Sequence, residues 1–159
     1  MTNRRHAAAP IAVALIAVAA SAAVLLALAV SAGAAATPGR LVVEVSGFQS
    51  DAGQLILRLY SGADGFPTDA GRSLRQVTQP IKAGRSVVEL ADLPFGSYAI
   101  GCVHDANDNG KLDTNLLGVP KEGVCASNDA RGHRGPPRWN DARFDFRADG
   151  TRLQIHVRY

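Results

Sequence analysis

The sequence predicts an all-β protein, a β-sandwich of about seven strands that follows an N-terminal apolar helix. Three observations predict it. After residue 36 apolar and polar residues alternate in short runs, turns rich in Gly, Asp and Pro separate those runs, and no stretch has helical periodicity. Short strands at regular spacing are typical of sandwiches. At 123 residues, the chain from 37 to 159 is long enough to bury a core of its own.

Residues 1–36 have the features of an export signal. Arg4 and Arg5 precede a charge-free run that ends in three alanines, which is the basic start, apolar helix and small-residue end of a secretory signal peptide. The apolar stretch 11–30 is also long enough to cross a bilayer, so an uncleaved anchor is the alternative to cleavage. In either case we expect residues 37–159 to be exported, into the periplasm, the cell envelope or the medium.

The charge balance gives no reason to expect a nucleic-acid partner. The whole chain carries a net charge of +3, but two of its 17 Lys and Arg lie in the N-terminal segment. Beyond residue 36, 15 Lys and Arg face 14 Asp and Glu, for a net charge of +1. Such a balance lacks the basic excess of nucleic-acid-binding domains. We expect contact with a membrane only through residues 1–36, if that segment is retained.

Four runs predict strands in the first half of the domain. Residues 40–48 and 53–60 each place alternate Leu and Val side chains on one face. The turn residues between them predict that these two strands form a hairpin. Residues 73–81 predict a weaker strand, because Pro80 cannot donate a ladder hydrogen bond. Residues 85–93 predict a stronger one.

The remaining strands lie on either side of a long irregular region. Residues 93–105 have small or apolar side chains on both faces, which predicts a central strand. In residues 142–159, apolar and polar residues alternate before and after Ala148-Asp149-Gly150, which is a hairpin signal. The second run predicts a final strand with one solvent-exposed face. Between them, a long loop at about 105–142 is rich in Gly and Pro. Loops of this length are commonly either functional or disordered.

The start of this loop, HDANDNGKLDTN at 104–115, has the spacing of a calcium-binding loop. The EF-hand frame needs oxygen ligands at positions 1, 3, 5, 7 and 9 and Gly at position 6. These positions correspond to Asp105, Asn107, Asn109, the backbone carbonyl of Lys111, and Asp113, with Gly110 at the turn.

The frame fails at position 12, where a bidentate Glu is required and Leu116 is present. Either water or Glu122, a possible additional metal ligand, must then complete the coordination shell of the ion. The sequence therefore predicts a weak calcium site. The alternative is an ion-free turn, in which Asp and Asn side chains bond their own backbone and Gly110 supplies a positive φ.

The two cysteines, Cys102 and Cys125, predict a disulfide. An even number of cysteines in an exported domain favours a bridge, which forms in an oxidising compartment. The alternative is a pair of buried free thiols.

An envelope enzyme of hydrolase type, with its site in the 105–142 loop, is the alternative to a binding or structural module. The motifs G-x-S-x-G and H-E-x-x-H are absent from the sequence. We expect His104 at the surface of a strand end and His156 facing solvent. Residues 131–139, RGHRGPPRW, predict a connector with solvated charges and a Trp that covers the core; a loop for an acidic or sugar ligand is the alternative.

Two segments resemble a family of secreted bacterial proteins known as domain of unknown function 2141. They are LPFGSYAIGCVHDANDNGKLDTNLLGVPKEG at 93–123 and GPPRWNDARF at 135–144, and the likeness extends over 40–159. The resemblance implies a sandwich of transthyretin or immunoglobulin-like type and an ion site at Asp105, Asn107, Asn109 and Asp113, but no activity. Cys102 and Cys125 both fall where the chain departs from the family pattern. A disulfide that fastens the far side of the loop to the preceding strand would explain both departures.

Together these observations predict an exported β-sandwich module with a binding or structural role and a loop stiffened by calcium. We expect its partner to be an envelope protein or a glycan. No residue is assigned a catalytic role.

Overall fold

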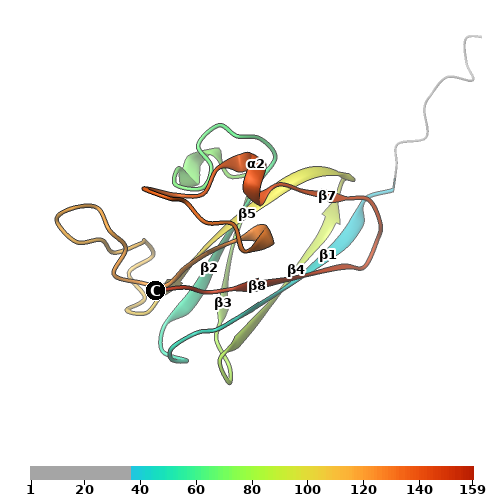
Figure 1. The fold of residues 1–159 in the computed structure, drawn as a ribbon. Coiled ribbons are helices and arrows are strands. Elements are labelled where there is room, and N and C mark those ends of the chain that lie inside the picture. Colours follow the sequence, from blue (N-terminus) through green and yellow to red (C-terminus); the bar gives the residue numbers. More distant parts are fainter. Residues whose placement is uncertain (1–36) are drawn as a thin grey trace, which may run out of the picture. The chain divides into compact units, whose positions relative to one another are not determined.

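In the computed structural model, residues 37–159 are described, and they form two β-sheets packed on each other (Figure 1). This confirms the all-β sandwich, with eight strands where about seven were predicted. The strands are β1 (Gly39–Ser46), β2 (Gln54–Tyr60), β3 (Arg75–Pro80), β4 (Arg85–Leu93), β5 (Gly96–Asp105), β6 (Val124–Ala126), β7 (Phe144–Phe146) and β8 (Thr151–His156). The predicted signal segment, residues 1–36, lies outside the described residues.

One sheet has the order β4-β1-β8, and the other has the order β3-β2-β5-β6 with β7 also paired to β5. Helical structure in the described chain is limited to three short pieces: 3₁₀ turns at Ala70–Arg72 and Ser127–Asp129, and the helix α2 at Trp139–Ala142. In residues 37–159 no helix has the length and hydrophobicity needed to cross a membrane.

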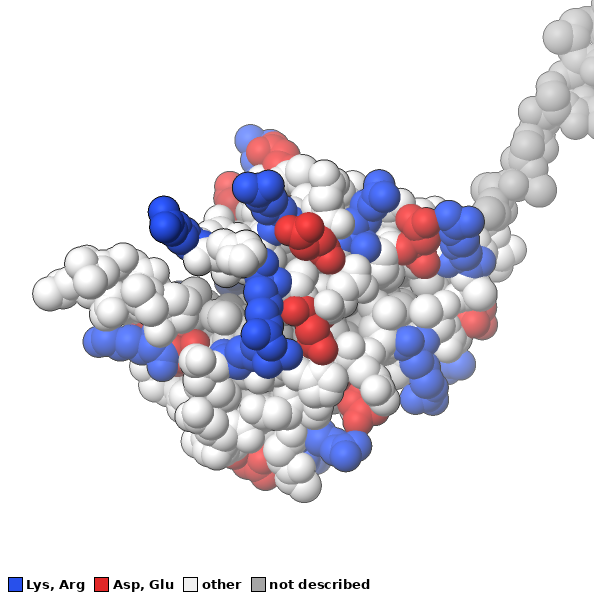
Figure 2. Space-filling view, viewed as in Figure 1, with Lys and Arg blue, Asp and Glu red and all other residues white. Residues whose placement is uncertain are grey.

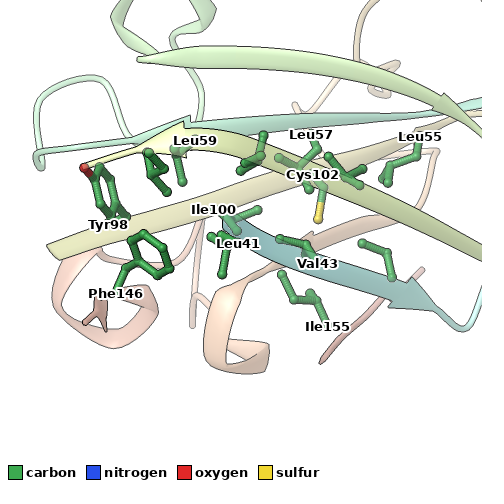
Figure 3. Packing of buried hydrophobic residues seen from close by; sticks show 14 of the residues in the cluster. Leu41, Val43, Leu55, Leu57, Leu59, Tyr98, Ile100, Cys102, Phe146 and Ile155 are labelled. Atoms are coloured by element: carbon green, nitrogen blue, oxygen red, sulfur yellow. The ribbon is translucent and has the colours of Figure 1, made fainter. Parts of the chain in front are cut away.

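The core lies between the two sheets and follows the predicted alternation. Leu41, Val43 and Val45 of β1 and Leu55, Leu57 and Leu59 of β2 are all 0 % exposed. Figure 3 shows side chains of β1, β2 and β5 directed toward one another in this core, which also includes Phe146 and Ile155. Burying each such side chain contributes about 1.5–3 kcal/mol, so this alternation is the main source of stability.

The predicted hairpin between the first two strands is wrong. β1 pairs with β4 in antiparallel and with β8 in parallel orientation, whereas β2 pairs with β3 and β5 in the other sheet. The connection therefore crosses between sheets. Turn residues predict that the chain reverses, but they carry no information on whether it reverses within one sheet.

The hairpin signal at Ala148-Asp149-Gly150 also does not form a hairpin. β7 pairs with β5, and β8 pairs with β1. The turn is bound to β1 instead, because Arg40 donates its backbone N–H to Asp149 at 2.6 Å and accepts from Gly150 at 2.8 Å. The turn thus passes the chain from one sheet to the other.

β5 is the central strand that its composition predicts. Its residues from Tyr98 to Asp105 are all buried. The face away from the main core is covered by a smaller cluster in which Ala99, Ala126 and Ala142 pack with Phe66, Ala130 and Trp139. Trp139 therefore covers the core, as predicted.

The structure divides the predicted 105–142 loop at β6. This strand pairs with β5 and places Cys125 opposite Cys102, with their Cα atoms 5.0 Å apart. The two residues form the predicted disulfide. What remains is an uninterrupted loop at 106–123, called the Asp105 loop below, whose far end is fastened to β5 by the bridge.

Candidate functional site at the Asp105 loop

Asp105 closes β5 and starts the loop, and its side chain is fully buried at 0 % exposure. Its Oδ1 accepts the backbone N–H of Asn109 at 3.0 Å. Its Oδ2 accepts the backbone N–H of Gly110 at 2.8 Å and the side-chain amide of Gln54 at 2.9 Å. Because Gln54 lies opposite Asp105 on β2, the carboxylate fastens the loop to the sheet.

Burial by itself would raise the pKa of Asp105, since a buried carboxylate loses its hydration. The hydrogen bonds from Gln54, Gly110 and Asn109 stabilise the charged form more strongly and hold the pKa below its ordinary value. Asp105 is therefore an anion at neutral pH. Its negative charge is what holds the first turn of the loop.

Gly53 makes this close approach of the loop to β2 possible. Its φ is +73°, and a Cβ at this position would lie 2.0 Å from the carbonyl oxygen of Asp105. Only glycine fits here, for both conformational and steric reasons.

The amides of Asn107 and Asn109 form two successive turns. Oδ1 of Asn107 accepts the N–H of Asn109 at 3.2 Å, and Oδ1 of Asn109 accepts the N–H of Lys111 at 3.0 Å. The side-chain amide of Asn107 also donates to Oδ2 of Asp113 at 2.9 Å. The structure thus brings the side chains of the predicted calcium set into one hydrogen-bonded turn.

Glu122 closes the base of the loop. It is 8 % exposed, and its Oε1 accepts the N–H of Ala106 at 3.0 Å while its Oε2 accepts the N–H of Asp113 at 2.8 Å. One carboxylate therefore joins the outgoing and returning arms. The sequence identified Glu122 only as a possible metal ligand; its contact with Ala106 depends on how the loop returns, which no local pattern encodes.

Beyond this base, the chain forms a closed turn at residues 114–120, called the tip. Oδ1 of Asn115 accepts the N–H groups of Leu117 at 2.9 Å and Val119 at 3.0 Å. The N–H of Asn115 donates to the carbonyl of Val119 at 2.9 Å, and Gly118 turns the chain with φ +77°. The sequence signal for this structure is limited to Asn115 and Gly118 around two leucines, too little to predict a closed turn.

The apolar side chains of the tip face solvent. Leu116 is fully exposed, Leu117 is 87 % exposed and Val119 is 54 % exposed. Figure 1 shows the loop as the orange projection at the left of the domain, beyond the ends of the strands. A turn closed by its own hydrogen bonds, with two leucines that are almost fully exposed, is the most distinctive surface feature of the domain.

The three histidines of the described chain lie in different environments. His104, expected at the surface, is buried at 2 % exposure and contacts Tyr159 and Ala52 through its two ring nitrogens. His104 is buried because Tyr159 packs over this end of β5. His156 is exposed as predicted and contacts Asp129, with Nδ1 2.8 Å from Oδ2.

His133 lines a shallow hollow of about 740 Å³ together with Arg131, Arg134, Arg138, Asp141 and the intervening Gly and Pro residues. Neither Asp105 nor Glu122 belongs to this hollow. The arrangement therefore does not pair a histidine with the loop carboxylates as a general base would require.

The side chains at the positions of the predicted calcium ligands offer carboxylate and amide oxygens. No group of three His, Cys, Asp or Glu side chains suited to a metal occurs in residues 37–159. Oδ1 of Asp105 and the amide oxygens of Asn107 and Asn109 each accept one hydrogen bond, which leaves a lone pair on each. Leu116, where the EF-hand frame requires Glu, offers no side-chain oxygen.

Fold and loop together define a class of protein: a disulfide-bridged β-sandwich domain whose longest loop is closed by buried carboxylates. Over residues 43–154 the chain matches the family described as "Uncharacterized protein conserved in bacteria (DUF2141)", and it belongs to that family. The matched range includes the whole Asp105 loop and the disulfide. No curated protein and no solved structure matches the chain.

Proposed function

We propose that this protein is an exported, non-enzymatic binding module that uses the Asp105 loop as its recognition element. One observation carries the proposal. Two buried carboxylates, Asp105 and Glu122, accept five hydrogen bonds that fix the loop, yet the tip they support presents its apolar side chains to solvent. A loop fixed in this way loses little conformational entropy when it binds.

Export is supported by two independent features. Residues 1–36 have the composition of a signal peptide or an anchor. The Cys102–Cys125 disulfide is compatible with an oxidising compartment. Mass spectrometry of the protein isolated from cells tests this directly: a mature N-terminus near Thr37 indicates cleavage, an intact N-terminus in the membrane fraction indicates an anchor, and a cytoplasmic full-length chain contradicts export.

Calcium binding is the second part of the proposal. The ligands would be Asp105, Asn107, Asn109, the Lys111 carbonyl and Asp113, with water in place of the missing Glu. With only two carboxylates in this set, the affinity would be that of a weak extracellular site, about 10⁻⁴–10⁻³ M. The ion would add to the rigidity that the hydrogen bonds already give to the loop.

Calorimetric titration of residues 37–159 with CaCl₂ tests this part. These residues hold both sheets, the disulfide and the whole described core, so they fold as a unit. We expect a saturable heat and a rise in melting temperature with calcium, both absent in Asp105→Asn. Asp108→Asn, an exposed acid with φ +58° that Asn also adopts, is the matched control and should respond like the wild type. Identical melting curves with and without calcium would rule out calcium binding by the Asp105 loop.

Hydrogen exchange tests the rigidity of the loop, whatever the result with calcium. The backbone amides of Ala106, Asn109, Gly110 and Asp113 donate to buried carboxylates, so we expect them to be protected in the calcium-free protein. Glu122→Gln removes one acceptor oxygen and should accelerate exchange at Ala106 or Asp113 only. Exchange of all four amides at the rate of an unfolded peptide would contradict the proposed recognition loop.

A further inference from the structure

We infer that the tip of the Asp105 loop docks the domain on the surface of an anionic lipid bilayer. This inference rests on the proposed role of the loop as a recognition element, and it names the partner. It begins from the three apolar side chains that the tip exposes, Leu116, Leu117 and Val119. Clustered exposed apolar residues at a projecting position mark protein or membrane contacts.

The backbone of the tip suits it to a medium with few hydrogen-bonding partners. Four of the five N–H groups from Asn115 to Val119 donate inside the turn: those of Asn115 and Gly118 to carbonyls, and those of Leu117 and Val119 to the Asn115 side chain. Unpaired backbone groups are what keeps most loops out of the hydrocarbon region. Most N–H groups of this turn therefore keep their hydrogen bonds when the tip enters the bilayer interface.

Cations flank the tip. Lys111 and Lys121 lie on its two arms and are both exposed. Arg131, Arg134 and Arg138 line the hollow in the segment before α2, which projects to the same side of the domain as the tip in Figure 1. In the described chain none of these five side chains forms a salt bridge.

Acidic residues in this region are as many as the five cations, but most of them are not exposed: Asp105 and Glu122 are buried and Asp113 is half-buried. Glu122 and Asp113 accept hydrogen bonds inside the loop, and the exposed acids are Asp108 on the loop and Asp141 in the hollow. Figure 2 shows the tip as an uncharged projection with Lys and Arg groups beside its base. An apolar tip beside exposed cations is complementary to a bilayer surface, in which acyl chains lie below anionic headgroups.

The size and shape of the tip favour a bilayer over a protein. A stable protein interface buries about 800 Å² on each partner, more than three side chains on a narrow convex turn offer. A bilayer accepts shallow insertion at any point of its surface, and the flanking cations extend the contact over the headgroups.

Co-sedimentation of residues 37–159 with vesicles tests this inference; the 1–36 segment is left out because its apolar run would itself bind lipid. We expect binding to vesicles of equal parts phosphatidylglycerol and phosphatidylcholine, and little binding to phosphatidylcholine alone. Binding should weaken with added salt, as for other headgroup contacts. The measurement is made with calcium and with chelator, so that its outcome does not depend on the calcium proposal.

The variant Leu116→Ser/Leu117→Ser should bind at least about tenfold more weakly, because it removes the inserting side chains. Val87→Ser is the matched control, since Val87 is 52 % exposed on β4 and away from the tip, and it should bind like the wild type. Lys111→Gln/Lys121→Gln should reduce binding to the anionic vesicles several-fold. Unchanged melting temperatures of these variants would show that the sandwich is intact.

Absence of binding to either vesicle, or equal binding by Leu116→Ser/Leu117→Ser and the wild type, would overturn the inference. Analytical ultracentrifugation provides the second measurement. If the leucine variant abolished self-association, or binding to an envelope protein or a polysaccharide, while vesicles were not bound, the bilayer assignment would be wrong. The recognition role of the loop would then stand.

Discussion

The imidazole of His104 and the hydroxyl of Tyr159, 55 residues apart in the chain, lie 2.6 Å from each other beneath the strand end. The other ring nitrogen lies 2.8 Å from the carbonyl of Ala52. Since a carbonyl only accepts, Nε2 carries a proton and donates to Ala52, and Nδ1 is the ring nitrogen bonded to the tyrosine hydroxyl. The hydroxyl in turn accepts the N–H of Gln49 at 3.0 Å, so Tyr159 ties the connection between β1 and β2 to the strand β5.

Removing that hydroxyl should destabilise the domain. Tyr159→Phe keeps the ring but leaves Nδ1 of the buried His104 without its hydrogen-bond partner, and we expect the free energy of unfolding to fall by about 1–2 kcal/mol. Urea denaturation followed by tryptophan fluorescence measures this change. A variant as stable as the wild type would show that the contact contributes nothing to the fold.

Acid should unfold the protein in part through Asp105. Its pKa is lowered from 3.8 in the folded protein, so its contribution to stability is complete above that value and is lost as the pH falls through the folded pKa. Asp105→Asn should cost about 2 kcal/mol at neutral pH, and the difference from wild type should shrink as the pH falls below about 4. Asp108→Asn again provides the control, and a constant difference across this range would exclude Asp105 as the titrating group.

Reduction of Cys102–Cys125 should weaken the domain. The bridge spans 23 positions, and closing a loop of that size contributes about 3 kcal/mol in the chain-entropy model. Urea midpoints with and without reductant measure the effect, and the double Ala variant should match the reduced wild type. Equal urea midpoints would mean that the disulfide does not contribute to stability and that β6 stays paired with β5 without it.

Two glycines of the same region should respond differently to alanine. Both have positive φ, but a Cβ on Gly53 would collide with Asp105 whereas one on Gly110 meets nothing within 4 Å. Gly110→Ala should cost about 1–2 kcal/mol from backbone conformation alone. Gly53→Ala should cost more than about 3 kcal/mol, since the loop must also move away from β2. Similar melting temperatures for the two variants would contradict this description of the loop base.

The sequence predicted those features that local chemistry determines. Alternation placed Leu55, Leu57 and Leu59 in the core, apolar residues on both faces made β5 central, and the cysteine count and inferred compartment predicted the disulfide. The pairing of β1 was not predictable in the same way, because its partners β4 and β8 are distant in sequence and one runs parallel.

The sequence identified the Asp105 loop, but not the contacts that close it. The spacing of Asp105, Asn107, Asn109 and Asp113 identified the loop, and the structure joins them in one turn. The closing role of Glu122 and the burial of His104 both depend on segments that return from elsewhere in the chain. Periodicity describes each strand by itself and contains no such information.

The parallel pairing of β1 with β8 has a mechanical consequence. The first and last strands of the domain lie side by side over six residue pairs and run in the same direction, so the two chain ends leave this pair at opposite extremities. Tension applied between Gly39 and Tyr159 would therefore load the ladder along its length, and its hydrogen bonds would have to rupture together rather than in succession. A domain built in this way is suited to bearing a pulling load.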